Sequence, residues 1–264
     1  MQLSSLLEKT GRKSQPQPLT NDLFGSDSQL IVPDPPGSNR VGSEAFRFIV
    51  SPRDISAAMR LNFEAERQFR QCVAEVLGKP CDAPLIRSRN ATILPVGAVA
   101  YDEQRFGLSA KGGMGFISKP GVMTNEGLFF IPIDFCQFLL QFLTVASLFY
   151  ETMMRFYGSY ELSVETVISQ AKLFPGSPAL KNRLAGAELF EPPLETIRAS
   201  TVVQIEVALH PISRSRLQDY LEAVLTEIGR SNGSVLNADF RTAMQAVVDE
   251  GVKRFNSVRA ARST

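Results

Sequence analysis

The segment "IPIDFCQFLLQFLTVASLFYETMMRFYG", residues Ile131–Gly158, is the most apolar stretch of the chain and decides the fold prediction. The positions between Asp134 and Glu151, 135 to 150, are 16 residues without a charge. A helix needs about 20 apolar residues to cross a bilayer, and this run also contains two glutamines. We therefore expect a helix buried on most of its circumference at the centre of the domain, with a single-pass membrane anchor as the weaker alternative.

Strand patterns lie on both sides of this helix. Apolar residues alternate with other residues in "EAFRFIV" (44–50), "SYELSVETVI" (159–168) and "TVVQIEVALH" (201–210), and such alternation is typical of strands with one buried face. Residues 85–118 contain the short runs "ATILPV", "AVAYD", "RFGLSA" and "MGFIS". These runs predict a β-meander.

The first helix has clear sequence signals at both ends. Ser51 suits the N-cap, Pro52 the first helical position and Asp54 the positive end of the helix dipole. Gly78 and Pro80 then end the predicted helix. The predicted helix would therefore follow the first strand without a linker.

Two more helices, Arg214–Gly229 and Ala238–Val258, are predicted at the end of the chain. The whole order indicates an α+β fold, a mostly antiparallel sheet packed by helices with one long buried central helix. We assign residues 44–264 to a single α+β domain and residues 1–43 to a flexible N-terminal arm.

The arm is rich in Pro, Ser, Gln, Asn and Asp, and it includes "SQPQP" and "PDPPGSN". Such a composition buries too little apolar surface to offset the entropy of ordering. Two apolar islands, "NDLFG" and "QLIVP", interrupt it, and each could dock on a partner or on the domain itself. The alternative is sparse apolar residues in a disordered tail. The candidate docking residues are Leu23, Phe24, Leu30, Ile31 and Val32.

Composition limits the classes of function. The 28 basic and 27 acidic residues give a net charge of +1, so no global field attracts nucleic acid. The odd number of cysteines, 3, shows no disulfide framework and favours a reducing, cytoplasmic setting. We see no apolar stretch of signal-peptide length at the start of the sequence.

The glycine-rich stretch "LSAKGGMGF" (108–116) does not match a phosphate-binding loop. Its lysine precedes the glycine pair, and no Ser or Thr follows, as a Walker loop requires. Gly112 and Gly113 instead predict a two-residue hairpin turn. Lys111 at its tip is then an exposed residue that could contact an anion.

Residues for catalysis are scarce. The single histidine, His210, directly precedes Pro211, and the sequence contains no nucleophile elbow and no CxxC pair. Glu161 and Glu165 share one strand face and could hold a divalent cation, although a solvated face explains them as well. We therefore assign no catalytic residue, no cofactor and no metal ligand, and a carboxylate- or metal-dependent enzyme stays an alternative.

Basic residues gather locally, and they could contact phosphate if they shared one face. The candidates are Arg87 and Arg89, Arg214 and Arg216, and in the C-terminal segment Lys253, Arg254, Arg259 and Arg262.

The leading hypothesis is nevertheless a non-enzymatic protein-interaction or assembly component with a docking arm. This hypothesis includes self-association of the chain through its central helix. The second hypothesis is a nucleic-acid-associated regulatory protein.

The second hypothesis makes a direct prediction. A chain that binds nucleic acid through these residues is retained on heparin at low salt, and retention falls steeply as salt rises, because phosphate contacts release counterions. A chain that passes through the column at low salt would exclude this function.

Overall fold

The computed structural model describes residues 45–53, 63–87, 91–96, 104–109, 112–118, 121–124, 127–130, 132–155, 158–173, 189–209 and 212–238, and single positions between 240 and 260. The predicted N-terminal arm with both apolar islands lies outside these residues, as do the predicted strand "AVAYD" and His210.

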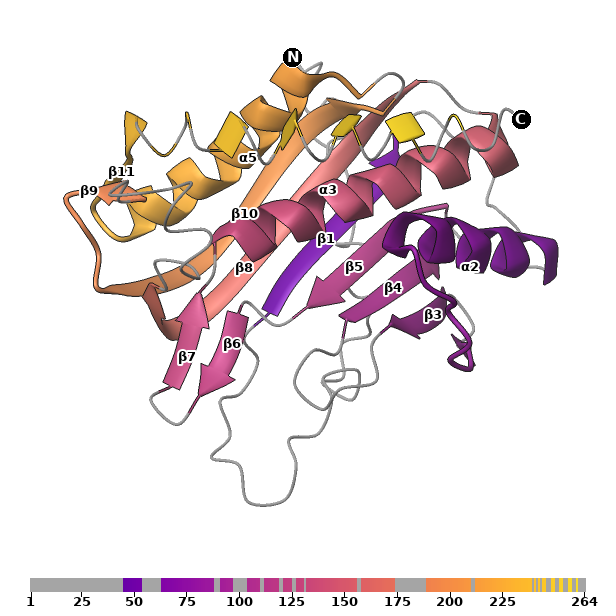
Figure 1. Ribbon diagram of the computed structural model, residues 1–264, viewed down its shortest axis with the longest axis horizontal. Coiled ribbons are helices and arrows are strands. Elements are labelled where there is room, and N and C mark those ends of the chain that lie inside the picture. Colours follow the sequence, from indigo (N-terminus) through magenta and orange to yellow (C-terminus); the bar gives the residue numbers. More distant parts are fainter. Residues whose placement is uncertain are drawn as a thin grey trace, which may run out of the picture.

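Nine strands form one sheet in the order β2-β3-β4-β5-β1-β8-β7-β6, and β10 pairs with β8 (Figure 1). All pairs are antiparallel except β7 with β8. The strands of this sheet are β1 (Ala45–Pro52), β2 (Ile86–Arg87), β3 (Ala91–Val96), β4 (Gln104–Ser109), β5 (Met114–Ser118), β6 (Gly121–Thr124), β7 (Gly127–Phe130), β8 (Ser159–Leu173) and β10 (Thr196–Ala208). A second, two-stranded sheet pairs β9 (Phe190–Glu191) with β11 (Val235–Leu236). The predicted α+β class with a mostly antiparallel sheet is confirmed.

The helices α2 (Phe63–Leu77), α3 (Pro132–Phe149) and α5 (Arg214–Ser231) cover one face of the large sheet, with α3 in the middle (Figure 1). The described positions between 238 and 260 are also helical, as predicted. Within the described part of the chain, no helix combines the length and the apolar character that crossing a membrane requires.

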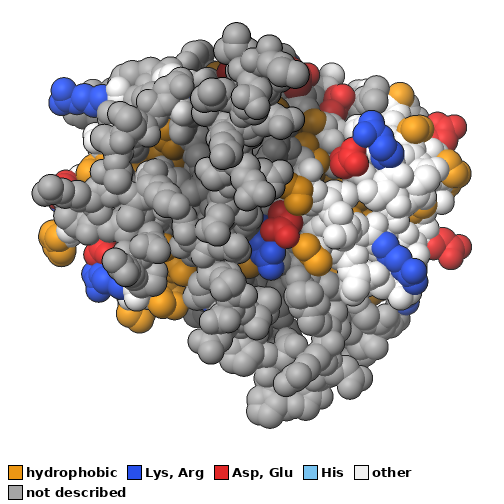
Figure 2. All heavy atoms as spheres, turned by 180° about the vertical axis from the view of Figure 1, so that it is seen from behind, with side chains coloured by type: hydrophobic (Ala, Val, Ile, Leu, Met, Phe, Trp, Pro, Cys, Tyr) orange, Lys and Arg blue, Asp and Glu red, His pale blue; other side chains and the backbone are white. Residues whose placement is uncertain are grey.

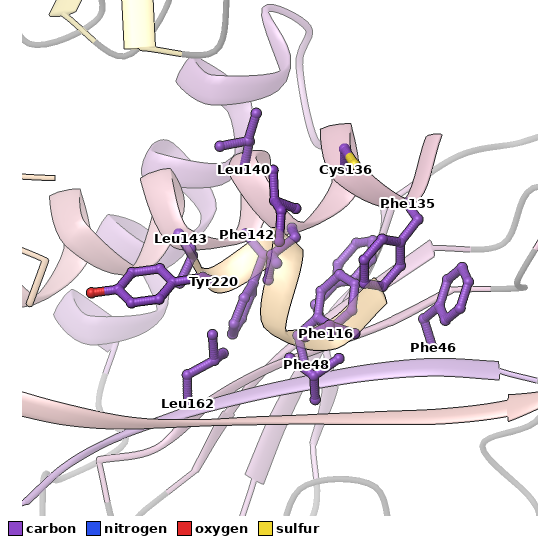
Figure 3. Close-up of a cluster of buried hydrophobic side chains, with 14 of the residues drawn as sticks. Phe46, Phe48, Phe116, Phe135, Cys136, Leu140, Phe142, Leu143, Leu162 and Tyr220 are labelled. Carbon is purple, nitrogen blue, oxygen red and sulfur yellow. The ribbon is translucent and has the colours of Figure 1, made fainter. Parts of the chain in front are cut away.

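The core is built where α3 lies on the sheet. Phe135 and Phe142 of α3 point toward Phe48 of β1 and Phe116 of β5 (Figure 3). The ring centroids of Phe48 lie 5.7 Å from Phe135 and 5.9 Å from Phe142, in edge-on and tilted arrangements. All four rings are buried, whereas Gln137 of α3 is exposed. The central helix is therefore apolar on most sides because other parts of the same chain cover it.

The central helix ends earlier than its sequence pattern predicts. After Phe149 the helix widens into a π-helical turn, η2 (Tyr150–Met154), and Arg155 follows in the left-handed conformation with φ 47°. The buried Tyr150 hydroxyl lies within hydrogen-bonding distance of the carbonyl oxygens of Val50 (3.1 Å) and Gly112 (2.8 Å). This contact fixes the end of α3 to β1 and to the β4–β5 turn, which the apolar periodicity alone does not show.

The predicted start of the first helix is wrong. Ser51 and Pro52 belong to β1, where they pair with Glu161 and Tyr160 of β8. The long neighbouring strand offers these residues ladder partners, so the strand continues through the predicted N-cap. The described part of helix α2 begins at Phe63, and Asp54 lies outside the described residues. The end of this helix at Gly78, with φ 66°, is as predicted.

The predicted glycine hairpin is confirmed in place but not in length. The Ser109 N–H donates to the Gly113 carbonyl at 2.8 Å, and the Gly112 N–H donates to the Ser109 carbonyl at 2.9 Å. Residues 110–113 therefore lie between β4 and β5, and of the two glycines only Gly112 has a positive φ, 81°. The register that buries Leu108 opposite Met114 sets this loop length.

The two long strands differ in extent from their predictions, since β8 continues past residue 168 to Leu173 and β10 begins at Thr196, ahead of the predicted Thr201, and ends at Ala208. β8 has 15 residues and β10 has 13, because each stabilises the other along nearly its whole length. The predicted alternation in β8 is confirmed, with Tyr160, Leu162 and Val164 buried and the residues between them partly exposed. The short strands β6 and β7 carry no clear alternation and were not predicted.

The Phe cluster predicts a large stability effect at one position. Replacing Phe142 with Ala should lower the free energy of unfolding by about 3–5 kcal/mol, because it removes a buried ring and leaves a cavity. The matched change at Phe63, whose side chain is 79% exposed, should cost less than about 0.5 kcal/mol. Denaturant unfolding followed by circular dichroism measures both, and equal losses would contradict the proposed core.

Candidate protein-interaction edge

β10 is the outermost strand beside β8, on the side of the sheet where α5 lies (Figure 1). Among the strands that the structure describes, β10 pairs with β8 alone. One row of its backbone N–H and C=O groups bonds to β8, and the alternate residues direct theirs away from the sheet. Such groups can accept a further strand.

Both ends of this edge are capped by side chains from α5 and the turn that follows it. At one end, Asn232 accepts the Arg198 N–H through Oδ1 at 2.9 Å and donates to the Arg198 carbonyl through Nδ2 at 2.8 Å. The Asn232 amide thus takes the place of a peptide group in a neighbouring strand. At the other end, the Ala208 N–H donates to the Tyr220 hydroxyl at 3.3 Å.

Arg198 and Ala208 both direct their N–H groups away from β8, so the alternate residues between them do the same. We call these four residues, Ser200, Val202, Gln204 and Glu206, the open edge. All four are exposed, and Val202 is 62% exposed. The open edge is therefore a short apolar and polar strand surface with available backbone groups.

The acidic strip predicted on β8 is occupied by ion pairs. Glu165 accepts from Arg47 of β1 at 2.8 Å. Glu161 lies 3.9 Å from Arg53, which also contacts Glu206 at 2.5 Å. Within the described residues, no group of three His, Cys, Asp or Glu side chains could hold a metal ion. The two carboxylates stabilise strand pairing and do not converge on a common point.

The charges seen from behind the molecule alternate in sign. Figure 2 shows Lys or Arg side chains next to Asp or Glu side chains on the described part of this face. Opposite charges are also paired in the ion contacts of Arg47 with Glu165 and of Arg53 with Glu206. Adjacent opposite charges cancel, so these pairs give no positive field toward a polyanion.

Arg87 is also engaged in a structural pair. Its guanidinium donates through Nε and Nη2 to Glu66 of α2, with the shortest contact at 2.6 Å, and the Thr92 hydroxyl donates to the same carboxylate at 2.9 Å. These bonds hold the pKa of the nearly buried Glu66 below its usual value, with Arg87 the main cause. The group ties α2 to β2 and β3.

The predicted basic residues do not form one cluster where the structure describes them. Arg214 pairs with Asp249 at 2.7 Å. It begins α5, which packs on β10, whereas Arg87 lies in β2 at the opposite side of the sheet. Arg216 and Lys253 are exposed. The candidates outside the described residues are Arg89, Lys111, Arg254, Arg259, Arg262, Leu23, Phe24, Leu30, Ile31 and Val32.

Burial disfavours the charged forms of two thiols and of the central tyrosine. All three cysteines, Cys72, Cys81 and Cys136, are buried and form no disulfide. Burial raises the pKa of the Cys136 thiol to about 12 and also raises that of Cys81. Burial likewise raises the pKa of Tyr150 well above its usual range. Since the thiolate is the nucleophile, Cys81 and Cys136 serve as small core residues in this fold.

Comparisons with protein-family models, with curated proteins and with solved structures found nothing that matches this chain.

The open edge was not predicted from the sequence. The alternation in residues 201–210 indicates a strand, but it does not show which strands lie beside it. The uncharged run Ser200–Gln204 is a weak signal, because edge strands usually carry a charge or a proline there. The structural role of Glu66 was missed as well, since its partners are 21 and 26 positions away.

The Glu66 group yields a prediction with a defined pH dependence. Replacing Glu66 with Gln should lower the free energy of unfolding by about 1–3 kcal/mol near pH 7, because buried hydrogen bonds to a carboxylate are lost. The pKa of Glu66 is lower in the folded state than its usual 4.5. Its contribution is therefore complete above about pH 4.5 and disappears as the pH falls through the folded-state pKa.

Unfolding of the wild type and of Glu66→Gln, measured between pH 3 and pH 7, should thus converge in acid. The control is Glu64→Gln, which removes an exposed carboxylate bonded to Arg67 one turn away and should have a much smaller effect. A difference that does not depend on pH would contradict this assignment.

Proposed function

We propose that the chain is a non-enzymatic protein-interaction or assembly component that binds an extended segment of a partner protein at the open edge of β10. The observation that carries this proposal is the geometry of that edge. No described strand pairs with the outward-facing backbone groups of four residues in the middle of a strand whose two ends are capped. Strand addition at such an edge is a common mode of peptide recognition.

The composition of the edge supports the same function. Natural sheets protect exposed edges with Lys, Pro or bulges because an open edge recruits other chains. Here Ser200, Val202 and Gln204 carry no charge, and Val202 is largely exposed. The protection lies at the two ends instead, in the contacts of Asn232 and Tyr220. The partner segment we expect is therefore short, extended and uncharged.

The N-terminal arm is the second part of the proposal. Its first apolar island contains Leu23 and Phe24 in a polar, proline-rich stretch, a pattern that suits a linear motif for a partner. A cytoplasmic setting belongs to the proposal too, and three cysteines that form no disulfide agree with a reducing compartment. The ion pairs of Arg87 and Arg214 lend the nucleic-acid alternative no support.

Affinity capture with full-length variants tests the proposal. Val202→Lys places a charge on the open edge, and Leu23→Asp with Phe24→Asp removes the first island. We expect each change to lose a defined set of captured proteins, identified by mass spectrometry. The matched control is Val235→Lys, because Val235 is equally exposed, at 64%, but lies in the separate two-stranded sheet.

A nuclease-treated sample is run in parallel. Capture that survives nuclease and falls with Val202→Lys but not with Val235→Lys supports the proposed function. Capture that only nuclease removes would replace it with the nucleic-acid alternative. Capture that is identical for all variants would contradict a role of the open edge and of the first island.

A further inference from the structure

We propose that the second apolar island of the arm, Gln29–Val32, adds as a short antiparallel strand to the open edge of β10 in the same chain. The arm would then compete with partner segments for that edge. The competition between the arm and a partner segment rests on the proposed function, because it requires that a partner binds this edge. The contact itself follows from the geometry of the edge and from the sequence of the island.

The length of the available edge selects a short occupant. Within the described part of the chain, the caps at Arg198 and Ala208 leave four outward-facing residues without a strand partner, and these span only the seven positions 200–206. The β10 strand of a second copy has 13 residues, so it would run against Asn232 and Tyr220 at the two ends. The island "QLIV" has four residues and is followed by Pro33, which cannot donate to a ladder and ends a strand.

The chemistry of the two segments also matches. Residues 29–32 carry no charge, and the nearest acids on either side are Asp27 and Asp34. Ile31 and Val32 are β-branched and favour the extended conformation. Leu30 and Val32 share one side of a strand, so with Val32 opposite Ser200, Leu30 lies opposite the exposed Val202 as its cross-strand neighbour.

The point at which the arm joins the sheet favours docking in the same chain. Ala45, the first residue of β1, pairs with Val167 of β8, which in turn pairs with Ser200 of β10. A strand added beyond β10 lies three strand spacings from β1, or about 14 Å. The residues 33–44 can span up to about 40 Å when extended, so the connection is easily long enough.

The direction of the added strand follows from the same register. β1 and β10 are both antiparallel to β8 and therefore run parallel to each other. An antiparallel island places Val32 near Ser200, at the end of the edge where the chain continues to Ala45. A tether of this length gives an effective concentration in the millimolar range, which favours the island over a free segment of similar affinity.

A disulfide experiment on the full chain tests the contact. Leu30→Cys is combined with Val202→Cys, and a control chain combines Leu30→Cys with Val235→Cys, a residue of the same exposure on the other sheet. Under mild oxidation the first pair should form an intramolecular disulfide at least about tenfold faster than the control pair, as a docked segment requires. Mass spectrometry of the monomer identifies the bond.

Equal rates for the two pairs, or a bond that forms only between two chains, would overturn the proposal. A second measurement needs no new cysteine. Leu30→Pro should increase the amide hydrogen exchange rates of Ser200 and Val202, since Pro at a position that faces β10 removes a ladder donor, whereas Leu23→Pro in the first island should leave them unchanged. Identical exchange in both variants and the wild type would also overturn it.

These results separate the inference from the proposed function. An intramolecular disulfide in a chain that captures no partner supports the docked island and contradicts the interaction role. Capture that depends on Val202 in a chain without this disulfide supports the interaction role and contradicts the docked island.

Discussion

The contact between the phenylalanines of α3 and those of the central strands is the interaction on which the other parts of the structure depend. A helix that is apolar on nearly all sides must be covered on nearly all sides. The sheet covers the side that carries Phe135 and Phe142, where Phe48 and Phe116 meet their rings. α2 and α5 contact α3 as well. The position of α3 thereby fixes which face of β1 and β5 is buried.

With that face buried, the charged residues of the strands must occupy the other face. There they pair with one another across neighbouring strands, as Arg47 does with Glu165 and Arg53 with Glu206. These pairs are partly exposed, and such pairs contribute little stability individually. They do, however, use up the carboxylates and guanidinium groups that would otherwise be candidates for metal or phosphate contact.

Once the side chains are assigned in this way, the backbone of β10 is a long strand edge that, among the described strands, pairs on one side only. Its ends are held by Asn232 and Tyr220, so the chain already protects β10 where it meets α5. The open edge between these caps is where a short extended segment finds both donors and acceptors. The proposed partner binding and the proposed docking of the arm both use this one surface.

The sequence by itself determined the class of fold and its main elements. The charge-free run around Phe142 favoured a covered helix, and the alternation around Leu162 favoured a half-buried strand, because both follow from local periodicity. The tertiary structure alone decided which strands are neighbours. Pairing with β8 turned Ser51 from a predicted helix cap into a strand residue, and Glu66 found Arg87 only through the packing of α2 on the sheet. The open edge of β10 was also decided by the tertiary structure, since the position of a strand at the edge depends on the whole sheet and not on any one segment.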